Sequence, residues 1–192
     1  SQPEGSMVID IGGGSTDIAI LSLDEIIASK SIRIAGNKFD EDIVKYVKRK
    51  YNLLIGDRTA EKIKKELATA LKVQNPEVME IKGRDLESGI PQTVEVNSNE
   101  IYEAIEDSLF KIVSATKEVL EKCPPELAAD ILDNGIVMTG GGSLIREFID
   151  MMEKEISIKV HLSPNPLDSV VLGGGAAFDN KKLLRTLQMR EN

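Results

Sequence analysis

Cysteine is almost absent from this 192-residue sequence, and Cys123 is the single example. One thiol excludes a disulfide framework and a thiolate metal site, and it fits the reducing environment of the cytoplasm. No apolar run approaches the roughly 20 residues that a membrane-spanning helix needs. His161 is the only histidine, and the chain has no nucleophile-elbow motif, so a serine hydrolase is excluded. We expect His161 to have a structural role.

Basic residues are outnumbered, with 24 Lys and Arg against 32 Asp and Glu and a net charge of −8. A chain of this charge would be repelled by a nucleic acid on average, so we expect no nucleic-acid partner. Hydrophobic residues make up 41% and charged residues 29%, which is typical of a soluble globular protein with a substantial core. The length fits one domain, or one domain with a large insertion.

A glycine-rich stretch near the start of the chain is the most informative motif. Residues 7–11 are apolar except for one acid, Asp10. Three glycines, Gly12–Gly14, follow them, and then Ser15, Thr16 and Asp17. This order predicts a strand, a tight turn and a second strand. Glycines let several backbone N–H groups approach an anion, so a phosphate site is one interpretation. The buried carboxylate of Asp10 would then face a metal ion. The alternative is an ordinary β-hairpin with a glycine turn and a capping aspartate.

Two further glycine triplets occur, so nine of the 15 glycines lie in triplets. Gly140–Gly142 follows the apolar strand predicted at 136–139 and precedes a helix that we expect to begin at Ser143. Gly173–Gly175 interrupts a helical pattern. Neither common nucleotide fingerprint is present, because the P-loop lysine is missing and Asp17 replaces the last glycine of Gly-x-Gly-x-x-Gly. The remaining interpretation is a nucleotide site built from a hairpin turn and a strand-to-helix turn.

The other patterns indicate a mixed α/β protein. Three strands reach residue 34, and they are followed by helices at 39–51 and 57–71 and by strands at 78–82 and 93–96 around a turn at 83–89. The residues from Gly36 to about Asn99 thus form a small α+β insertion. A long helix capped by Asn97 or Ser98 comes next. Pro124–Pro125 ends it and can open a short helix at 126–132, which Asn134–Gly135 ends, and a strand follows at 158–162.

The motifs resemble those of a known family. Residues 10–17 resemble the second phosphate motif of the actin, sugar-kinase and heat-shock-chaperone ATPase superfamily, and residues 136–143 resemble its adenosine motif. Residues 52–64, 83–86 and 124–131 are similar to those of the MreB family of bacterial actin homologues. The resemblance implies the second half of such a protein. Its α/β fold would consist of a ribonuclease-H-like actin-fold subdomain, residues 1–35 and 100–192, with an inserted small α+β subdomain, residues 36–99.

The resemblance also implies roles for individual residues toward ATP or ADP and Mg²⁺. Asp10 would reach Mg²⁺ through water, and Asp10 and Thr16 would be catalytic. Glu61 and Lys64 would meet the ribose and adenine. The implied nucleotide-binding set is Gly12, Gly13, Gly14, Ser15, Thr16, Gly36, Glu61, Lys64, Gly140, Gly141, Gly142, Ser143 and Leu144. The first phosphate hairpin and the acid that orients the attacking water belong to the family's other half and have no counterpart here.

The function implied by the resemblance is that of an ATPase that polymerises into cytoskeletal filaments controlling bacterial cell shape and cell-wall synthesis. The implied partners are further copies of the protein and the cell-shape and cell-wall synthesis proteins. We expect a bacterial cytoplasmic protein, whose complete form lies at the inner face of the membrane through segments absent here. We expect this chain alone to be inactive. Two alternatives stay open, namely a small-molecule kinase of the same superfamily and a non-enzymatic interaction module that retains the fold.

Overall fold

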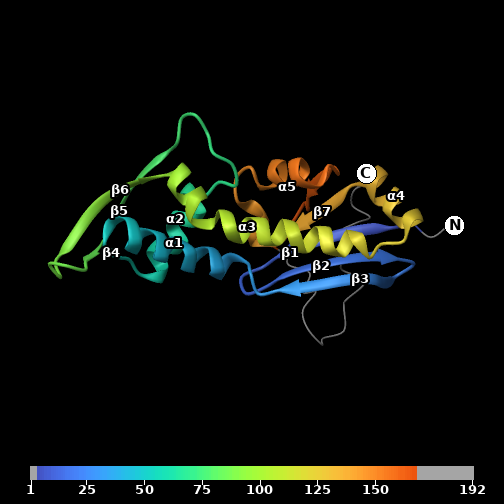
Figure 1. Ribbon diagram of the computed structural model, residues 1–192, viewed down its shortest axis with the longest axis horizontal. Helices are drawn as coiled ribbons and strands as arrows, with labels where there is room; N and C mark the ends of the chain where they lie inside the picture. The colour runs from blue at the N-terminus through green and yellow to red at the C-terminus, as the bar shows by residue number, and fades with distance from the viewer. Residues whose placement is uncertain (1–3, 168–192) are drawn as a thin grey trace. The chain divides into compact units, whose positions relative to one another are not determined.

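A computed structural model describes residues 4–167, which form two compact units (Figure 1). Unit 1 comprises residues 4–36, 111–144 and 149–167 of the described part, and unit 2 comprises residues 37–110 and 145–148. The predicted triplet Gly173–Gly175 lies outside the described residues. Within those residues, no helix is both long and apolar enough to cross a membrane.

Unit 1 is built on a five-stranded sheet with the order β3-β2-β1-β7-β8. Figure 1 shows β1, β2 and β3 running side by side, as the antiparallel ladders require. Strand β7 is parallel to both β1 and β8. The strands are β1 (Ser6–Ile11), β2 (Thr16–Ser22), β3 (Glu25–Ile32), β7 (Ile136–Thr139) and β8 (Val160–Leu162). The predicted three-strand meander is confirmed.

The central strands of this sheet are buried on both faces. Every residue of β2 and β7 is buried, and so are the last five residues of β1. Strands covered on both sides have apolar residues in succession rather than in alternation, which is the pattern these segments show in the sequence. The polar exceptions in these three strands, Asp10, Thr16, Asp17, Ser22 and Thr139, therefore need partners or a function.

Unit 1 contains the second part of α3 (Ser98–Glu121), from Lys111 onward, and three further helical elements. They are α4 (Pro125–Asn134), the 3₁₀ turn η1 (Gly141–Leu144) and most of α5 (Phe148–Ile156). Helix α4 ends at Asn134, and its C-cap residue Gly135 has a φ of 79°. A Cβ there would overlap the His161 ring and a backbone oxygen, so Gly135 and His161 pack closely. This contact supports the structural role expected for His161.

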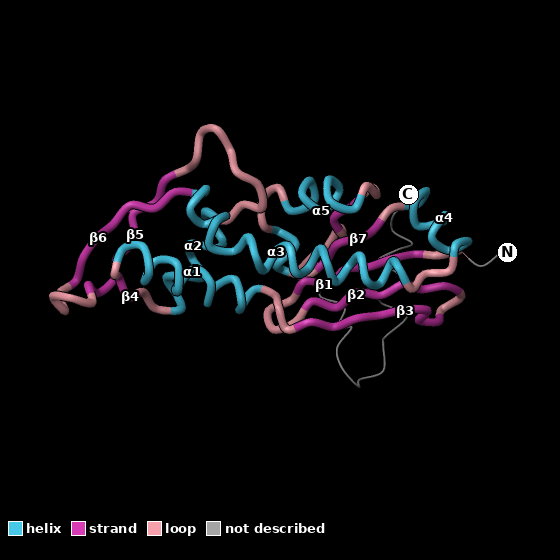
Figure 2. Tube along the Cα trace, viewed as in Figure 1, coloured by secondary structure: helices cyan, strands magenta, loops and turns pink. Residues whose placement is uncertain are grey.

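Unit 2 packs helices against a three-stranded sheet of order β4-β5-β6, whose long β5–β6 hairpin is magenta in Figure 2. Buried Phe39, Ile43 and Val47 from α1 and Ile63 from α2 form much of its core. The remaining core side chains include Ile101, Ile105 and Leu109 from the first part of α3. The elements are α1 (Gly36–Tyr51), β4 (Leu53–Leu54), α2 (Asp57–Leu67), β5 (Val78–Asp85) and β6 (Pro91–Asn97).

Helix α3 begins with a reciprocal cap, which confirms Asn97 as the capping residue. The backbone N–H of Glu100 donates to Asn97 Oδ1 at 3.1 Å, and the N–H of Asn97 donates to Glu100 Oε2 at 2.8 Å. The Ser98 hydroxyl instead accepts from the Glu77 N–H at 3.2 Å. Because α3 is divided between the two units at Lys111, the subdomain boundaries 1–35, 36–99 and 100–192 stay a prediction.

Three sequence-based expectations are corrected. Helix α2 ends at Leu67 rather than at Leu71, because the Ala70 N–H donates to the Arg146 carbonyl at 2.8 Å instead of continuing the helix. Strand β5 continues through Gly83 to Asp85, and Gly83 is required there because a Cβ would overlap Leu53 and Leu54 of β4. No α-helix begins at Ser143, because residues 141–144 form a 3₁₀ turn and α5 begins only at Phe148.

Candidate nucleotide site

The turn between β1 and β2 has the shape that the glycine triplet predicts. The Gly12 N–H donates to the Ser15 carbonyl at 3.0 Å, which closes the turn, and Gly13 and Gly14 are exposed. The Gly36 N–H donates to the Gly12 carbonyl at 3.0 Å, so the fold brings Gly36 to this turn from 24 residues further along the chain. Backbone amides at an exposed glycine turn are the groups that bind phosphate oxygens in proteins.

Asp10 is the most unusual side chain of the sheet. It is 4% exposed, and its Oδ1 atom has no hydrogen-bond partner among the described residues. Burial, helped by the nearby charge of Asp17, raises the pKa of Asp10 from 3.8 to about 7. A buried carboxylate with an unused oxygen is costly for folding, which is expected where a ligand or ion completes the site.

Asp17 is a site residue to which sequence reasoning assigned no role. It lies directly opposite Asp10 in the β1–β2 register, and Thr139 is the registered neighbour of Asp10 on β7. Cross-strand partners point to the same face of a sheet, so these three polar residues form a row. Asp17 Oδ2 accepts from the Ser15 hydroxyl at 3.0 Å, while its Oδ1 has no hydrogen-bond partner in the described part of the chain. The hairpin register was the signal that would have found this pair.

The second glycine turn lies against the first strand. Gly140 has a φ of 84°, and a Cβ there would overlap the Asp10 carboxylate and the Ile11 carbonyl. A Cβ on Gly142 would overlap the Ile11 side chain. Gly141 is different, because its nearest atom would be Leu167 Cδ2 at 3.6 Å, an ordinary contact. Packing within the protein therefore explains Gly140 and Gly142 but leaves Gly141 without an internal steric reason to be glycine.

The same test gives no internal steric reason for two glycines of the first triplet. A Cβ on Gly14 would meet nothing within 4 Å, and on Gly12 it would meet only the Ser15 carbonyl oxygen at 3.5 Å. Neither residue has a φ in the left-handed region. Neither internal packing nor backbone strain requires glycine at these two positions, so the backbone there is open to close approach of a ligand.

Two hydroxyl groups of the predicted set are already used inside unit 1. Thr16 is fully buried and donates from Oγ1 to the Ile34 carbonyl at 2.6 Å. Ser143 is buried and donates from Oγ to the Gly140 carbonyl at 2.5 Å, which closes the 3₁₀ turn. Leu144 is 48% exposed and leaves an apolar surface next to that turn. The catalytic role of Thr16 and the ligand contacts of Ser143 and Leu144 stay predictions.

Glu61 and Lys64 lie on α2, in unit 2, whereas the glycine turns belong to unit 1. The Lys64 ammonium lies 3.0 Å from Asp40 Oδ1 and 3.1 Å from Asp40 Oδ2. Glu61 pairs with Lys65 at 2.6 Å, as the sequence spacing predicts. Asp40, which sequence reasoning missed, fixes the Lys64 ammonium. Burial raises the Asp40 pKa and the Lys64 partner opposes that rise.

A preformed cage for a metal ion is not found among residues 4–167, where no three His, Cys, Asp or Glu side chains form a cluster that could hold one. Asp10 with its unused oxygen is suited to a different arrangement, in which a hydrated Mg²⁺ keeps most of its waters and meets the protein through a single carboxylate.

The chain is similar to proteins of one family throughout its length. The family model described as "MreB/Mbl protein" matches residues 1–186. The cell shape-determining protein Mbl of Bacillus subtilis is 49% identical over 179 residues, which cover 93% of this chain and 54% of that protein. The cell shape-determining protein MreB of Escherichia coli K12 is 46% identical, with coverage of 93% and 52%. The chain therefore spans about half the length of the curated relatives it matches.

Solved structures agree with this result. A crystal structure of MreB5 of Spiroplasma citri bound to ADP matches with a TM-score of 0.85 and 38% identity, covering 99% of this chain and 56% of that one. MreB5 has also been solved with AMPPNP. A MamK double helical filament matches with a TM-score of 0.71 at 22% identity, over 97% of this chain and 54% of that one, which shows a shared fold.

Proposed function

Because this chain belongs to the MreB/Mbl family, we propose that it forms the nucleotide-binding half of an actin-like ATPase that polymerises into cytoskeletal filaments. The complete protein would act in the bacterial cytoplasm, at the inner face of the membrane, and control cell shape together with cell-wall synthesis proteins. The fold is the actin fold, as the likeness to MreB5 shows. Nucleotide, metal and partners are proposals for this chain.

The single observation that carries the proposal is the environment of Asp10. The buried Asp10 carboxylate, with its unused oxygen, lies beside two glycine turns. In these turns Gly12, Gly14 and Gly141 have room for a Cβ atom. An ordinary β-hairpin would account for a turn, but it gives no reason for Gly14 and Gly141 to be glycine. A nucleotide phosphate group with its cation would satisfy both features.

We propose the following division of roles. The backbone of Gly12, Gly13, Gly14 and Ser15 binds the β- and γ-phosphates, and Gly36 stabilises that turn through its bond to Gly12. Asp10 orients a water of hydration of Mg²⁺, which when bound neutralises phosphate charge. Gly141 allows close approach of the adenosine, and Glu61 accepts hydrogen bonds from the ribose hydroxyl groups while Lys64 lines the base.

Assembly provides the test of the whole proposal. Head-to-tail growth of an actin-like filament requires contacts from both ends of a closed, nucleotide-bound subunit. We expect the complete protein to form filaments with ATP and Mg²⁺ in electron micrographs, and the isolated chain at matched concentration to stay a monomer or weak dimer. ATP-dependent filaments from the isolated chain would show that the polymer contacts are assigned wrongly. A complete protein that neither binds ATP nor polymerises would reject the proposal.

A further inference from the structure

Four residues between η1 and the body of α5 pack with a different unit from their neighbours in the chain. Ile145–Phe148 belong to unit 2, whereas Gly141–Leu144 and the chain from Ile149 belong to unit 1. Ile145 and Phe148 are buried, while Arg146 and Glu147 are exposed. Glu147 has a φ of 61°, which is uncommon for a residue other than glycine and is typical of a segment whose path is fixed by its surroundings.

Arg146 joins this segment to the end of α2 through its backbone and its side chain. Its carbonyl accepts from the Ala70 N–H at 2.8 Å, and Thr69 and Arg146 form an isolated parallel bridge. Its guanidinium donates from Nη2 to the Glu66 carbonyl at 3.2 Å and from Nε to the Ala68 carbonyl at 3.5 Å. The last carbonyls of a helix have no intrahelical partner and carry its negative dipole end, so a cation there is favourable.

The turn of α2 that Arg146 holds is the turn that contains Lys64. The Ala68 N–H closes the helix by donating to the Lys64 carbonyl at 3.2 Å, and the Ala68 carbonyl in turn accepts from Arg146. The other end of Lys64 is held by Asp40. Within unit 2, Arg146 therefore holds the backbone of the turn that contains Lys64, and Asp40 holds the Lys64 ammonium.

We propose that Arg146 is a positioning residue for the adenosine part of the nucleotide. By holding the last turn of α2, it sets the position of Lys64 within unit 2. This inference rests on the proposed function, because it presupposes a bound adenosine. Arg146 itself does not touch the ligand.

Two other uses of Arg146 fit the structure less well. Its guanidinium already meets Glu66 and Ala68 carbonyls and pairs with Glu77 at 2.7 Å, so it is not an open anion site. A pocket of about 210 Å³ lies beside it in unit 2. The polar groups of Thr69, Ser98 and Arg146 that line this pocket are engaged in bonds within unit 2, which leaves a small ligand few groups to bind.

The experiment compares two ligands that share a phosphate chain but differ in the adenosine. In the complete protein, Arg146→Ala should weaken ATP binding about tenfold, because the charge-assisted hydrogen bonds from the guanidinium to the Glu66 and Ala68 carbonyls are lost. Binding of inorganic tripolyphosphate with Mg²⁺ should change less than about twofold, since only the adenosine side loses its positioning. Discrimination of ATP from 2′-deoxy-ATP should also fall. Arg146→Lys keeps the charge but not the planar fork, and should give an intermediate ATP affinity.

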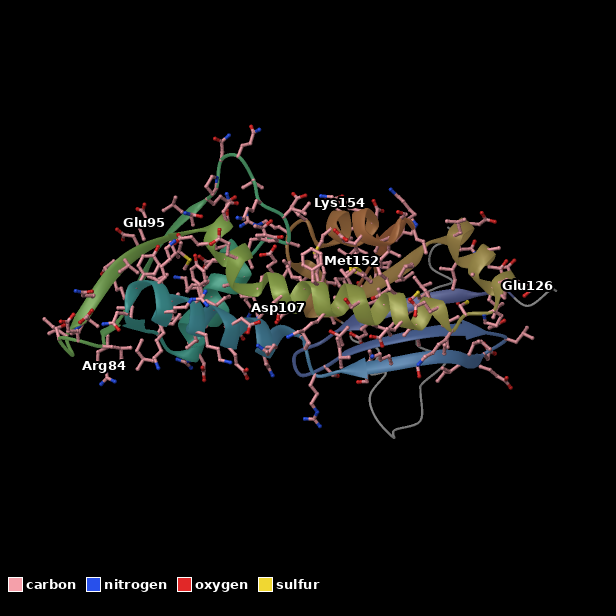
Figure 3. All side chains as sticks on the ribbon, viewed as in Figure 1. Arg84, Glu95, Asp107, Glu126, Met152 and Lys154 are labelled. Atoms are coloured by element: carbon pink, nitrogen blue, oxygen red, sulfur yellow. The ribbon has the colours of Figure 1, made fainter. Side chains whose placement is uncertain are left out.

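Matched variants separate positioning from general effects. Arg84 is exposed on β5, and its labelled side chain points away from the hairpin in Figure 3, so Arg84→Ala removes the same charge from unit 2 and should leave both affinities unchanged. Glu77→Gln removes only an exposed ion pair and should also have little effect.

Unchanged ATP affinity in Arg146→Ala, or an equal loss for ATP and tripolyphosphate, would overturn the inference while leaving the proposed function intact. If Arg146→Ala does not fold, Arg146→Lys decides by the same comparison. A wild-type protein that binds tripolyphosphate and ATP equally would reject adenosine recognition, and the inference with it.

Discussion

Asp10 and Asp17 face each other across the β1–β2 ladder, both nearly excluded from solvent, and each has a carboxylate oxygen without a hydrogen-bond partner among the described residues. Two like charges at directly opposed strand positions repel each other, and burial increases the cost. A stable sheet tolerates this pair only if one acid holds a proton or a cation lies nearby. The pair therefore links protonation at this site to the binding of a ligand.

Stability of the ligand-free chain should depend on pH through Asp10. The folded state keeps the Asp10 proton up to about pH 7, whereas the unfolded chain loses it near 3.8. Because the folded state binds more protons in this window, the free energy of unfolding should fall as pH rises from 3.8 to about 7, and then level off. Asp10→Asn should remove this slope and raise the melting temperature at pH 8 without Mg²⁺ or nucleotide. Asp133→Asn, an exposed change of the same charge, is the control, and an unaltered slope in Asp10→Asn would contradict the assignment.

Two glycines of one triplet should respond differently to alanine. A Cβ on Gly142 would overlap Ile11, so Gly142→Ala should destabilise the fold by about 1–3 kcal/mol, as overpacked cores do. A Cβ on Gly141 has room, so Gly141→Ala should leave the melting temperature almost unchanged and weaken ATP binding in the complete protein. Thermal unfolding with and without nucleotide measures both effects. Equal losses of stability with and without ATP in Gly141→Ala would favour a purely structural turn.

Glu61 should set recognition of the sugar. Its carboxylate is exposed and pairs with Lys65, so Glu61→Ala and Lys65→Ala both break this surface pair and should change stability little. If Glu61 accepts from the ribose hydroxyl groups, Glu61→Ala should discriminate less well between ATP and 2′-deoxy-ATP, whereas Lys65→Ala should discriminate as the wild type does. Competition binding measures the ratio of the affinities for ATP and 2′-deoxy-ATP. The same ratio in all three proteins would leave Glu61 as an ordinary surface residue.

Hydrolysis of ATP by the isolated chain should be negligible. The resemblance assigns the acid that orients the attacking water to the other half of the protein, and positioning of reactants can supply roughly 7–11 kcal/mol of barrier reduction. Phosphate release from the chain alone, measured beside the complete protein, provides the comparison. A turnover near one per minute from the chain, abolished by Asp10→Ala, would contradict this expectation.

The sequence alone determined the parts of this protein that depend on neighbouring residues. Continuous apolar runs specified the central strands β1, β2 and β7, because strands buried on both faces need no alternation. Glycine and proline fixed the turn at Gly12–Gly14 and both ends of α4, and Asn97–Ser98 indicated where α3 begins. Motif resemblance also identified the family and the candidate site, since its glycines and Asp10 are contiguous in the chain.

Tertiary structure decided the features that depend on residues far apart in the chain. Helix α2 stops at Leu67 because the Ala70 N–H meets Arg146, and Gly83 continues a strand because β4 packs against it. Strand register places Asp17 opposite Asp10, and packing within unit 2 places Asp40 against Lys64. Neither contact can be read from neighbouring residues in the sequence. Local pattern fixes which backbone conformation a segment prefers, but burial and long-range hydrogen bonds determine where that conformation ends and which polar groups meet.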